Sequence, residues 1–202
     1  MSPPNIKSFL PHDKLSEKIW NKDETMKEDV RSALLKIASE FLNYLKVDID
    51  VIDITMTGSY ANYNYTKFSD IDLHIVIEFA GVKADEDLVE GFMSAKRSYW
   101  NDTYDITVNG IEVELYPQDV GEPHESSGVF SVADNIWVVK PQKFVKDPNV
   151  KAAKKKADML KRQIKSSIKS KNLTEIERMI EKIKSMRKSG LEKSGEMSTE
   201  NI

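Results

Sequence analysis

Two segments in the middle of this 202-residue chain alternate apolar and polar side chains, and a Gly-Ser turn lies between them. The first covers residues 51–56, and the second covers residues 70–79 with an isoleucine or leucine at every second position from 71 to 77. A period of two is typical of a β-strand that covers a hydrophobic core with one face. A similar pattern recurs at 111–116. The chain is therefore expected to build a β-sheet around these strands.

The polar side of the second segment carries Asp70, Asp72 and His74. Because alternate side chains of a strand share a face, the two carboxylates are expected to point the same way. Two like charges about 4 Å apart cost on the order of 4 kcal/mol at an effective dielectric constant of about 20. Divalent cations reverse that cost, since hard oxygen ligands suit Mg²⁺ and two such ions can clamp the attacking and leaving oxygens of a phosphoryl displacement. The pair indicates a metal site for this chemistry.

Two further features belong to such a site. A third carboxylate is expected in the segment 111–116, where Glu112 and Glu114 share a face, so spacing alone does not choose between them. The turn Gly58-Ser59 follows the first strand and is the predicted phosphate site. Glycine lets backbone approach a ligand closely, and a helix beginning at Ser59 would offer unpaired N–H groups to phosphate oxygens.

The stretch from Val51 to Tyr116 resembles the DNA polymerase β-type nucleotidyltransferase superfamily, whose pattern is a Gly-Ser turn, an Asp-x-Asp strand and a later acidic strand residue. The resemblance implies an α+β fold in which helices flank a small mixed β-sheet. It implies that Asp70, Asp72 and Glu114 are catalytic and bind two Mg²⁺ ions, with Mn²⁺ as an alternative, and that Gly58-Ser59 binds the triphosphate. Glu114 matches the third position by its Val-Glu-Leu context, although many members have Asp there. The whole chain also resembles small predicted nucleotidyltransferases of tailed phages.

The activity implied by this resemblance is transfer of NMP from an NTP to an acceptor hydroxyl, with release of pyrophosphate. Three acceptors stay open: an RNA end, especially that of a tRNA, a protein hydroxyl, and a small molecule such as an antibiotic. The alternative is a catalytically silent nucleotide- or nucleic-acid-binding module of the same fold, against which the intact carboxylates argue. Taken singly, a Gly-Ser turn and an Asp-x-Asp pair are more often structural, but together they favour the transferase.

Several polar residues near these motifs have open roles. His74 is better explained as a hydrogen-bonded strand residue than as a base or a ligand. His124 lies in the polar connection 121–128, which is long enough to be a functional loop, and is a weak candidate for substrate contact. Lys96 and Arg97 lie on an expected helix from which they would reach phosphate, although solvent exposure is the favoured interpretation.

Composition restricts the class of protein. The chain has no cysteine, which excludes disulfides, thiolate zinc sites and a cysteine nucleophile. It shows no long apolar run and no signal pattern, so no membrane partner is expected and the cytoplasm is the expected location. Residues 1–139 carry 12 Lys/Arg against 25 Asp/Glu, whereas residues 140–202 carry 18 against 8. The basic part favours a polyanionic partner, either the NTP or RNA, with a solvated helix surface as an equal alternative.

The patterns divide the chain into three parts. We expect a nucleotidyltransferase catalytic core over residues 1–140, a basic helical hairpin docked on it over 141–190, and a flexible tail over 191–202. The oligomeric state stays open. The predicted elements outside the strands already described are helices from Asp23 or Glu24 to Leu45, over 85–101, 148–169 and 174–188, and one further strand over 130–139.

Overall fold

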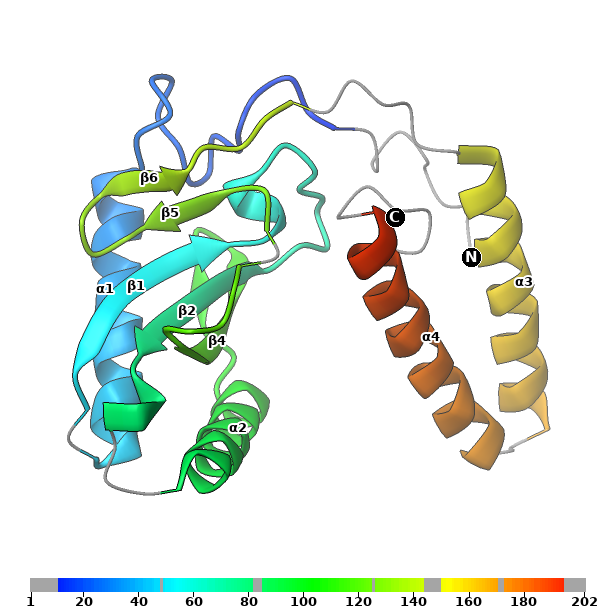
Figure 1. Cartoon of the computed structure of the whole chain (residues 1–202). Helices are drawn as coiled ribbons and strands as arrows, with labels where there is room; N and C mark the ends of the chain where they lie inside the picture. Colours follow the sequence, from blue (N-terminus) through cyan, green and yellow to red (C-terminus); the bar gives the residue numbers. More distant parts are fainter. Residues whose placement is uncertain are drawn as a thin grey trace. The chain divides into compact units, whose positions relative to one another are not determined.

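The computed structural model describes residues 11–47, 49–81, 85–124, 126–143, 150–170 and 173–194 (Figure 1). The chain divides into two units. One is Pro11–Lys143, and the other contains the helices α3 (Val150–Lys169) and α4 (Leu173–Ser194).

The Pro11–Lys143 unit is built on a six-stranded sheet with the order β3-β4-β2-β1-β5-β6 (Figure 1). Its central strand β2 pairs in antiparallel fashion with β1 and in parallel with β4. The sheet is therefore mixed, which confirms the predicted α+β fold class. The strands are β1 (Val51–Thr57), β2 (Ile71–Ile77), β3 (Thr107–Val108), β4 (Ile111–Asp119), β5 (Val129–Ser131) and β6 (Ile136–Val139).

The two faces of β2 differ as its alternation predicted. Ile71, Leu73, Ile75 and Ile77 are at most 1% exposed and belong to the same hydrophobic core as the helix α1 (Glu28–Leu45). In Figure 1, α1 runs along the sheet. Burying these aliphatic side chains stabilises the sheet by roughly 1.5–3 kcal/mol each. The other face of β2 is only partly buried and carries the polar residues.

The helix α2 (Glu86–Thr103) is fixed against β4 by one side chain. Its first turn is capped by Asp85, whose carboxylate accepts a hydrogen bond from the Leu88 amide. Near its end, the amide of Asn101 donates to the Leu115 carbonyl and accepts from the Leu115 N–H, both at 3.1 Å. Because β3 pairs only with the beginning of β4, Asn101 supplies the partners that β3 does not. This contact holds the end of α2 beside β4.

Three predicted boundaries differ from the structure. The first helix begins at Glu28 rather than at Asp23 or Glu24, because residues 20–26 form a turn in which Glu24 adopts a left-handed φ of 64°. The single strand predicted over 130–139 is wrong: β5 and β6 form a hairpin whose turn contains Asn135 at φ 60°. The helix predicted to end at Lys188 continues to Ser194.

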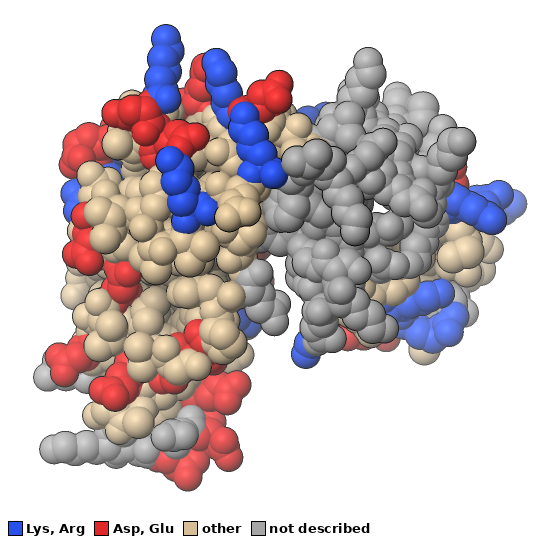
Figure 2. All heavy atoms as spheres, turned by 45° about the horizontal axis from the view of Figure 1, so that its top comes forward, with Lys and Arg blue, Asp and Glu red and all other residues tan. Residues whose placement is uncertain are grey.

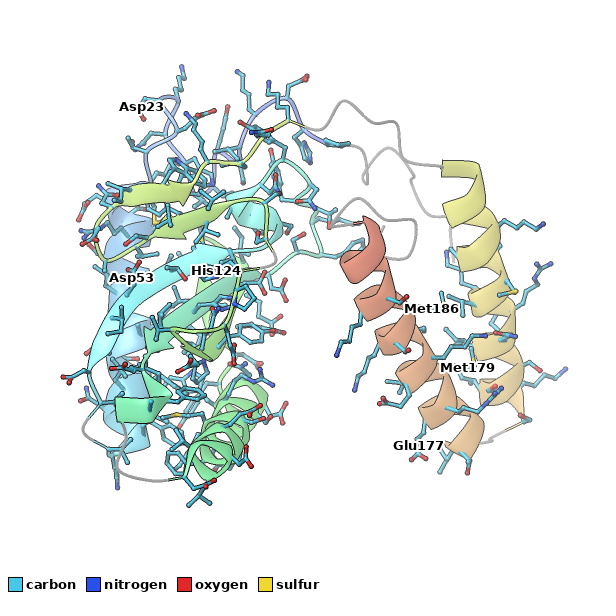
Figure 3. The ribbon with its side chains drawn as sticks, viewed as in Figure 1. Asp23, Asp53, His124, Glu177, Met179 and Met186 are labelled. Carbon is cyan, nitrogen blue, oxygen red and sulfur yellow. The ribbon has the colours of Figure 1, made fainter. Side chains whose placement is uncertain are left out.

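The second unit consists, in its described part, of α3 and α4, as predicted. The contact between the helices includes the buried Ser167 and Met179, whose hydroxyl and sulfur lie 3.8 Å apart (Figure 3). The predicted docking of this hairpin on the core stays a prediction, as do the domain limits, and residues 195–202 of the predicted flexible tail lie outside the described part. Figure 2 shows Asp and Glu side chains spread over the Pro11–Lys143 unit. None of the described helices is long and apolar enough to cross a membrane.

Candidate active site

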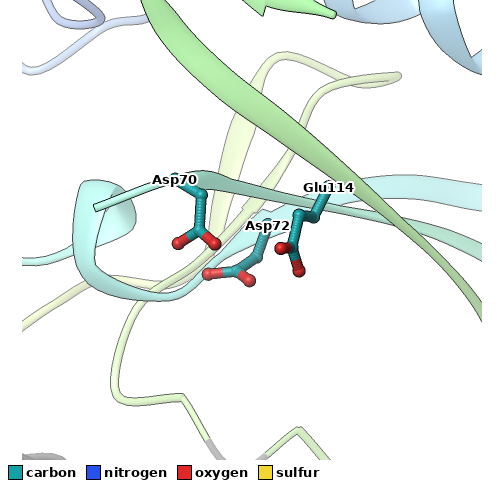
Figure 4. Close-up of side chains that lie close together, drawn as sticks. All are labelled: Asp70, Asp72 and Glu114. Atoms are coloured by element: carbon teal, nitrogen blue, oxygen red, sulfur yellow. The ribbon is translucent and has the colours of Figure 1, made fainter. Parts of the chain in front are cut away.

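Three carboxylates from two neighbouring strands meet on the polar face of the sheet. Oxygen atoms of Asp70, Asp72 and Glu114 all lie within 4.8 Å of one another, and the three residues are half-buried (Figure 4). The strand register explains the meeting, because Asp72 lies opposite Glu114 in the parallel pair and Asp70 directly precedes β2. Glu112 is exposed and pairs with Thr107 of β3. The geometry therefore brings Glu114, and not Glu112, to the two aspartates.

The turn after β1 lies directly against this carboxylate cluster. Gly58 has a φ of +72°, and a Cβ atom on it would lie 1.7 Å from Oδ2 of Asp72. Only glycine adopts this positive φ without strain and lacks the Cβ atom that would displace the carboxylate. The Gly58 amide donates to Oγ of Ser126 at 3.2 Å. The helix expected at Ser59 is a single 3-10 turn, Ser59–Ala61, so it does not provide the helix terminus that the sequence suggested.

A tyrosine on β4 holds Glu114. The hydroxyl of Tyr116 donates a hydrogen bond to Oε2 of Glu114. Burial raises the pKa of Tyr116, and the neighbouring Glu114 carboxylate raises it further, so the phenol keeps its proton at neutral pH. The hydrogen bond fixes the direction of the Glu114 carboxylate and leaves its other oxygen for a ligand.

A hydrogen-bonded row crosses three strands next to the cluster. Gln118 donates from Nε2 to the Glu122 carbonyl at 3.0 Å, so its Oε1 accepts from Nδ1 of His74 at 2.7 Å. That leaves Nε2 of His74 to accept from the Thr57 hydroxyl at 3.0 Å. Burial is the main cause that lowers the pKa of His74 to about 4. His74 is thus a neutral, doubly bonded strand residue, in agreement with the favoured interpretation of the sequence.

A cavity of about 450 Å³ opens on this face, beside the carboxylate cluster. The Tyr116 ring forms part of it. Its centroid lies 5.2 Å from that of the stacked His74 ring and 5.1 Å from the Arg97 guanidinium. His124 reaches the cavity from the 121–124 segment and meets His74 edge-on at 6.1 Å (Figure 3). The described residues that line it are Thr57, His74, Arg97, Tyr116, Pro117, Gln118, Glu122, Pro123, His124 and Ser126.

Sequence reasoning did not single out all of these residues. Tyr116 and Gln118 continue the alternation of Glu114 along β4, so the pattern that located Glu114 also placed them on its face. Thr57 was visible only as the residue before the turn. No local pattern marks Ser126, because its position depends on a contact with Gly58 that spans 68 residues.

The family model described as a nucleotidyltransferase domain matches residues 36–188. No curated protein gives a significant match. Among solved structures, the chain is similar to the STING-associated CdnE c-di-GMP synthase from Capnocytophaga granulosa, with 16% identity and a TM-score of 0.25 over 71% of this chain and 52% of that chain. The chain thus spans about half the length of that protein. From the family match, which covers most of its length, the chain belongs to the nucleotidyltransferase domain family.

Proposed function

We propose that this protein transfers NMP from an NTP to an acceptor hydroxyl and releases pyrophosphate in a metal-dependent reaction. The observation that carries the proposal is the cluster of Asp70, Asp72 and Glu114, with oxygens within 4.8 Å of one another, directly beside the Gly58 turn. It combines a cation site and a glycine turn of the kind that approaches phosphate, which are the two parts such a transfer needs.

The donor set fits divalent metal ions. Three carboxylates at this separation repel one another, and their hard oxygens are the ligands that Mg²⁺ and Mn²⁺ prefer. When bound, such ions supply charge neutralisation for the triphosphate and lower the pKa of the attacking hydroxyl. Asp70 and Asp72 would hold both ions, and Glu114 would hold the one on the acceptor side.

The protein's own residues orient the reactants. The Gly58-Ser59 turn would take the triphosphate, because the absence of a side chain at Gly58 lets this backbone lie directly against the Asp72 carboxylate. Glu114, held by Tyr116, would receive the proton of the acceptor hydroxyl. The row Thr57-His74-Gln118 ties β1, β2 and β4 together next to these groups and keeps their spacing fixed.

Three classes of acceptor are compatible with this proposal. RNA ends suit the basic helices α3 and α4, to which the family match extends. A protein hydroxyl or a small molecule suits the cavity beside Glu114. The deciding experiment incubates the protein with each α-labelled NTP, Mg²⁺ or Mn²⁺, and separate fractions of RNA, protein and small molecules. Label in one fraction identifies the acceptor class. Saturable NTP binding without label in any fraction would favour the silent binding module instead.

A further inference from the structure

Arg97 carries a charge that the described structure leaves without an acceptor. It is half-buried on α2, and among the described residues no carboxylate or carbonyl receives a hydrogen bond or ion pair from it. Its one described contact is the face of the Tyr116 ring, at 5.1 Å. A half-buried guanidinium without an anion is unfavourable, and a planar fork of N–H donors is suited to bind an oxyanion. The cavity of about 450 Å³ that it lines has room for one.

Arg97 lies on the β4 side of the carboxylate cluster, whereas the Gly58 turn lies on the β1 side. In the sheet, β1 with Gly58 flanks β2 on one side, and β4 with Glu114 and Tyr116 flanks it on the other. Attacking and leaving oxygens lie roughly in line in nucleotidyl transfer. If the triphosphate lies at the Gly58 turn, the in-line arrangement directs the attacking hydroxyl to the β4 side, where Arg97 lies. The cavity extends from Arg97 to Thr57 and Ser126, which adjoin the turn.

We propose that the cavity is an acceptor site and that Arg97 binds an oxyanion group, phosphate or carboxylate, of a small hydroxyl-bearing acceptor. The inference rests on the proposed function. The cavity volume lies in the range of about 300–1,000 Å³ that is typical of small-molecule sites. The Tyr116 ring and the neutral His74 form flat walls beside the guanidinium, while Glu122 and His124 line the cavity from an exposed segment.

The test uses the full chain, saturated with Mg²⁺ and an α,β-methylene NTP, and titrates it with matched compounds. Glycerol 3-phosphate, glycerate and glycerol form one series, and AMP and adenosine form a second. Binding is followed by calorimetry and by the NMR signal of the Arg97 Nε–H. We expect the anionic members to bind and to shift that signal, and the neutral members to bind at least about tenfold more weakly. Comparison of glycerol 3-phosphate with glycerate then identifies the preferred anion.

Three variants at two positions of the same helix make the test specific. Arg97→Gln removes the fork and is expected to weaken anion binding about tenfold or more, while Arg97→Lys keeps the charge and part of the affinity. Lys96→Gln is the matched control, because Lys96 lies over the rings of Tyr44 and Phe92 and does not line the cavity. It should leave binding unchanged.

The outcomes distinguish this inference from the proposed function. Normal binding of the NTP analogue together with equal binding of charged and neutral probes, or with no binding of any probe, overturns the acceptor site alone. The same holds if Arg97→Gln weakens the NTP analogue instead of the probes, which would place the arginine on the nucleotide side. Failure of the wild type to bind Mg²⁺ with the NTP analogue would overturn the proposed function itself.

Discussion

The two units of this protein carry their polar side chains in opposite ways. In the Pro11–Lys143 unit, several polar side chains next to the carboxylate cluster are buried or partly buried and have a fixed hydrogen-bond partner, such as Tyr116 on Glu114 or Gln118 on His74. On α3 and α4, the described charges are largely exposed, and the pair Lys184–Glu181 has both side chains at least 70% exposed. Fixed hydrogen-bond partners hold reacting groups in place, whereas single solvated charges contribute little and affect a charged ligand mainly through their combined electrostatic field. Single substitutions should therefore matter in the first unit, and only multiple ones in the second.

The largest expected effect is a loss of NMP transfer on substitution of Glu114, with Glu112 on the same strand as the comparison. Glu114→Gln removes a carboxylate from the cluster without changing its volume, and we expect NMP transfer to fall roughly 10³-fold, as for loss of several kcal/mol of transition-state stabilisation. Glu112→Gln is the matched control, because Glu112 is exposed and outside the cluster. Its rate should stay within a few fold of wild type. The reverse ranking in a single-turnover assay would move the third ligand to Glu112.

The next effect needs several changes at once. Lys161, Lys165 and Lys169 lie four residues apart on α3, and a phosphate backbone along them would release counterions on binding. If RNA is bound there, reversing all three to Glu should lower RNA affinity about 10²-fold at 0.1 M salt and reduce the slope of log K against log salt by roughly three. Mg²⁺–NTP binding should not change.

A single reversal outside the basic helices, Lys36→Glu on α1, is expected to leave RNA affinity nearly unchanged. If wild type binds no RNA even at low salt, the basic helices are a solvated surface, and a protein or small-molecule acceptor becomes the better interpretation.

The third effect concerns pH and the buried imidazole. In the folded protein the pKa of His74 is lowered to about 4, whereas an unfolded histidine titrates near 6.5, so between these values the unfolded state binds the additional proton. His74 should therefore leave stability unaffected above about pH 6.5 and cost on the order of 2–3 kcal/mol as pH falls toward 4. Urea unfolding of the metal-free protein at several pH values, compared with His74→Gln, isolates this contribution. Parallel pH profiles for the two proteins would contradict it.

The smallest effect compares two glycines. Gly58→Ala would place Cβ 1.7 Å from Oδ2 of Asp72 at a φ of +72°, so the aspartate must move and Mn²⁺ affinity should fall about tenfold or more. Gly91→Ala in α2 meets no atom within 4 Å and should raise stability by roughly 0.5–1 kcal/mol with no change in Mn²⁺ affinity. Mn²⁺ titration followed by electron paramagnetic resonance gives the affinities, and equal affinities in both variants would show that the turn does not support the metal site.

Local patterns predicted the parts of this protein that depend on neighbouring residues. The alternation in β2 placed Asp70 and Asp72 on one face, and the period along β4 placed Glu114 there with Glu112. The choice between the glutamates needed the register of β4 on β2, which two segments about 40 residues apart determine by their packing.

The rest of the site could not be predicted because it depends on contacts distant in sequence. Ser126 meets Gly58 across 68 residues, and Arg97 faces the cavity because Asn101 anchors α2 on β4. The hairpin of β5 and β6 was missed for a different reason. Its turn is followed by apolar residues that continue the strand pattern, and Arg31 of α1 fixes it by donating to the carbonyls of Val132 and Ala133.

The most direct test of nucleotidyl transfer at the carboxylate cluster follows two labels. Wild type and Asp72→Asn are incubated with Mg²⁺, the acceptor fraction, and NTP labelled either at the α- or at the γ-phosphate. For wild type we expect the α-label in the acceptor and the γ-label in pyrophosphate alone, and for Asp72→Asn a roughly 10³-fold loss of both products. Circular dichroism of the metal-free variant should show that it is folded. Transfer of the γ-label to the acceptor, or full activity of folded Asp72→Asn, would contradict the account.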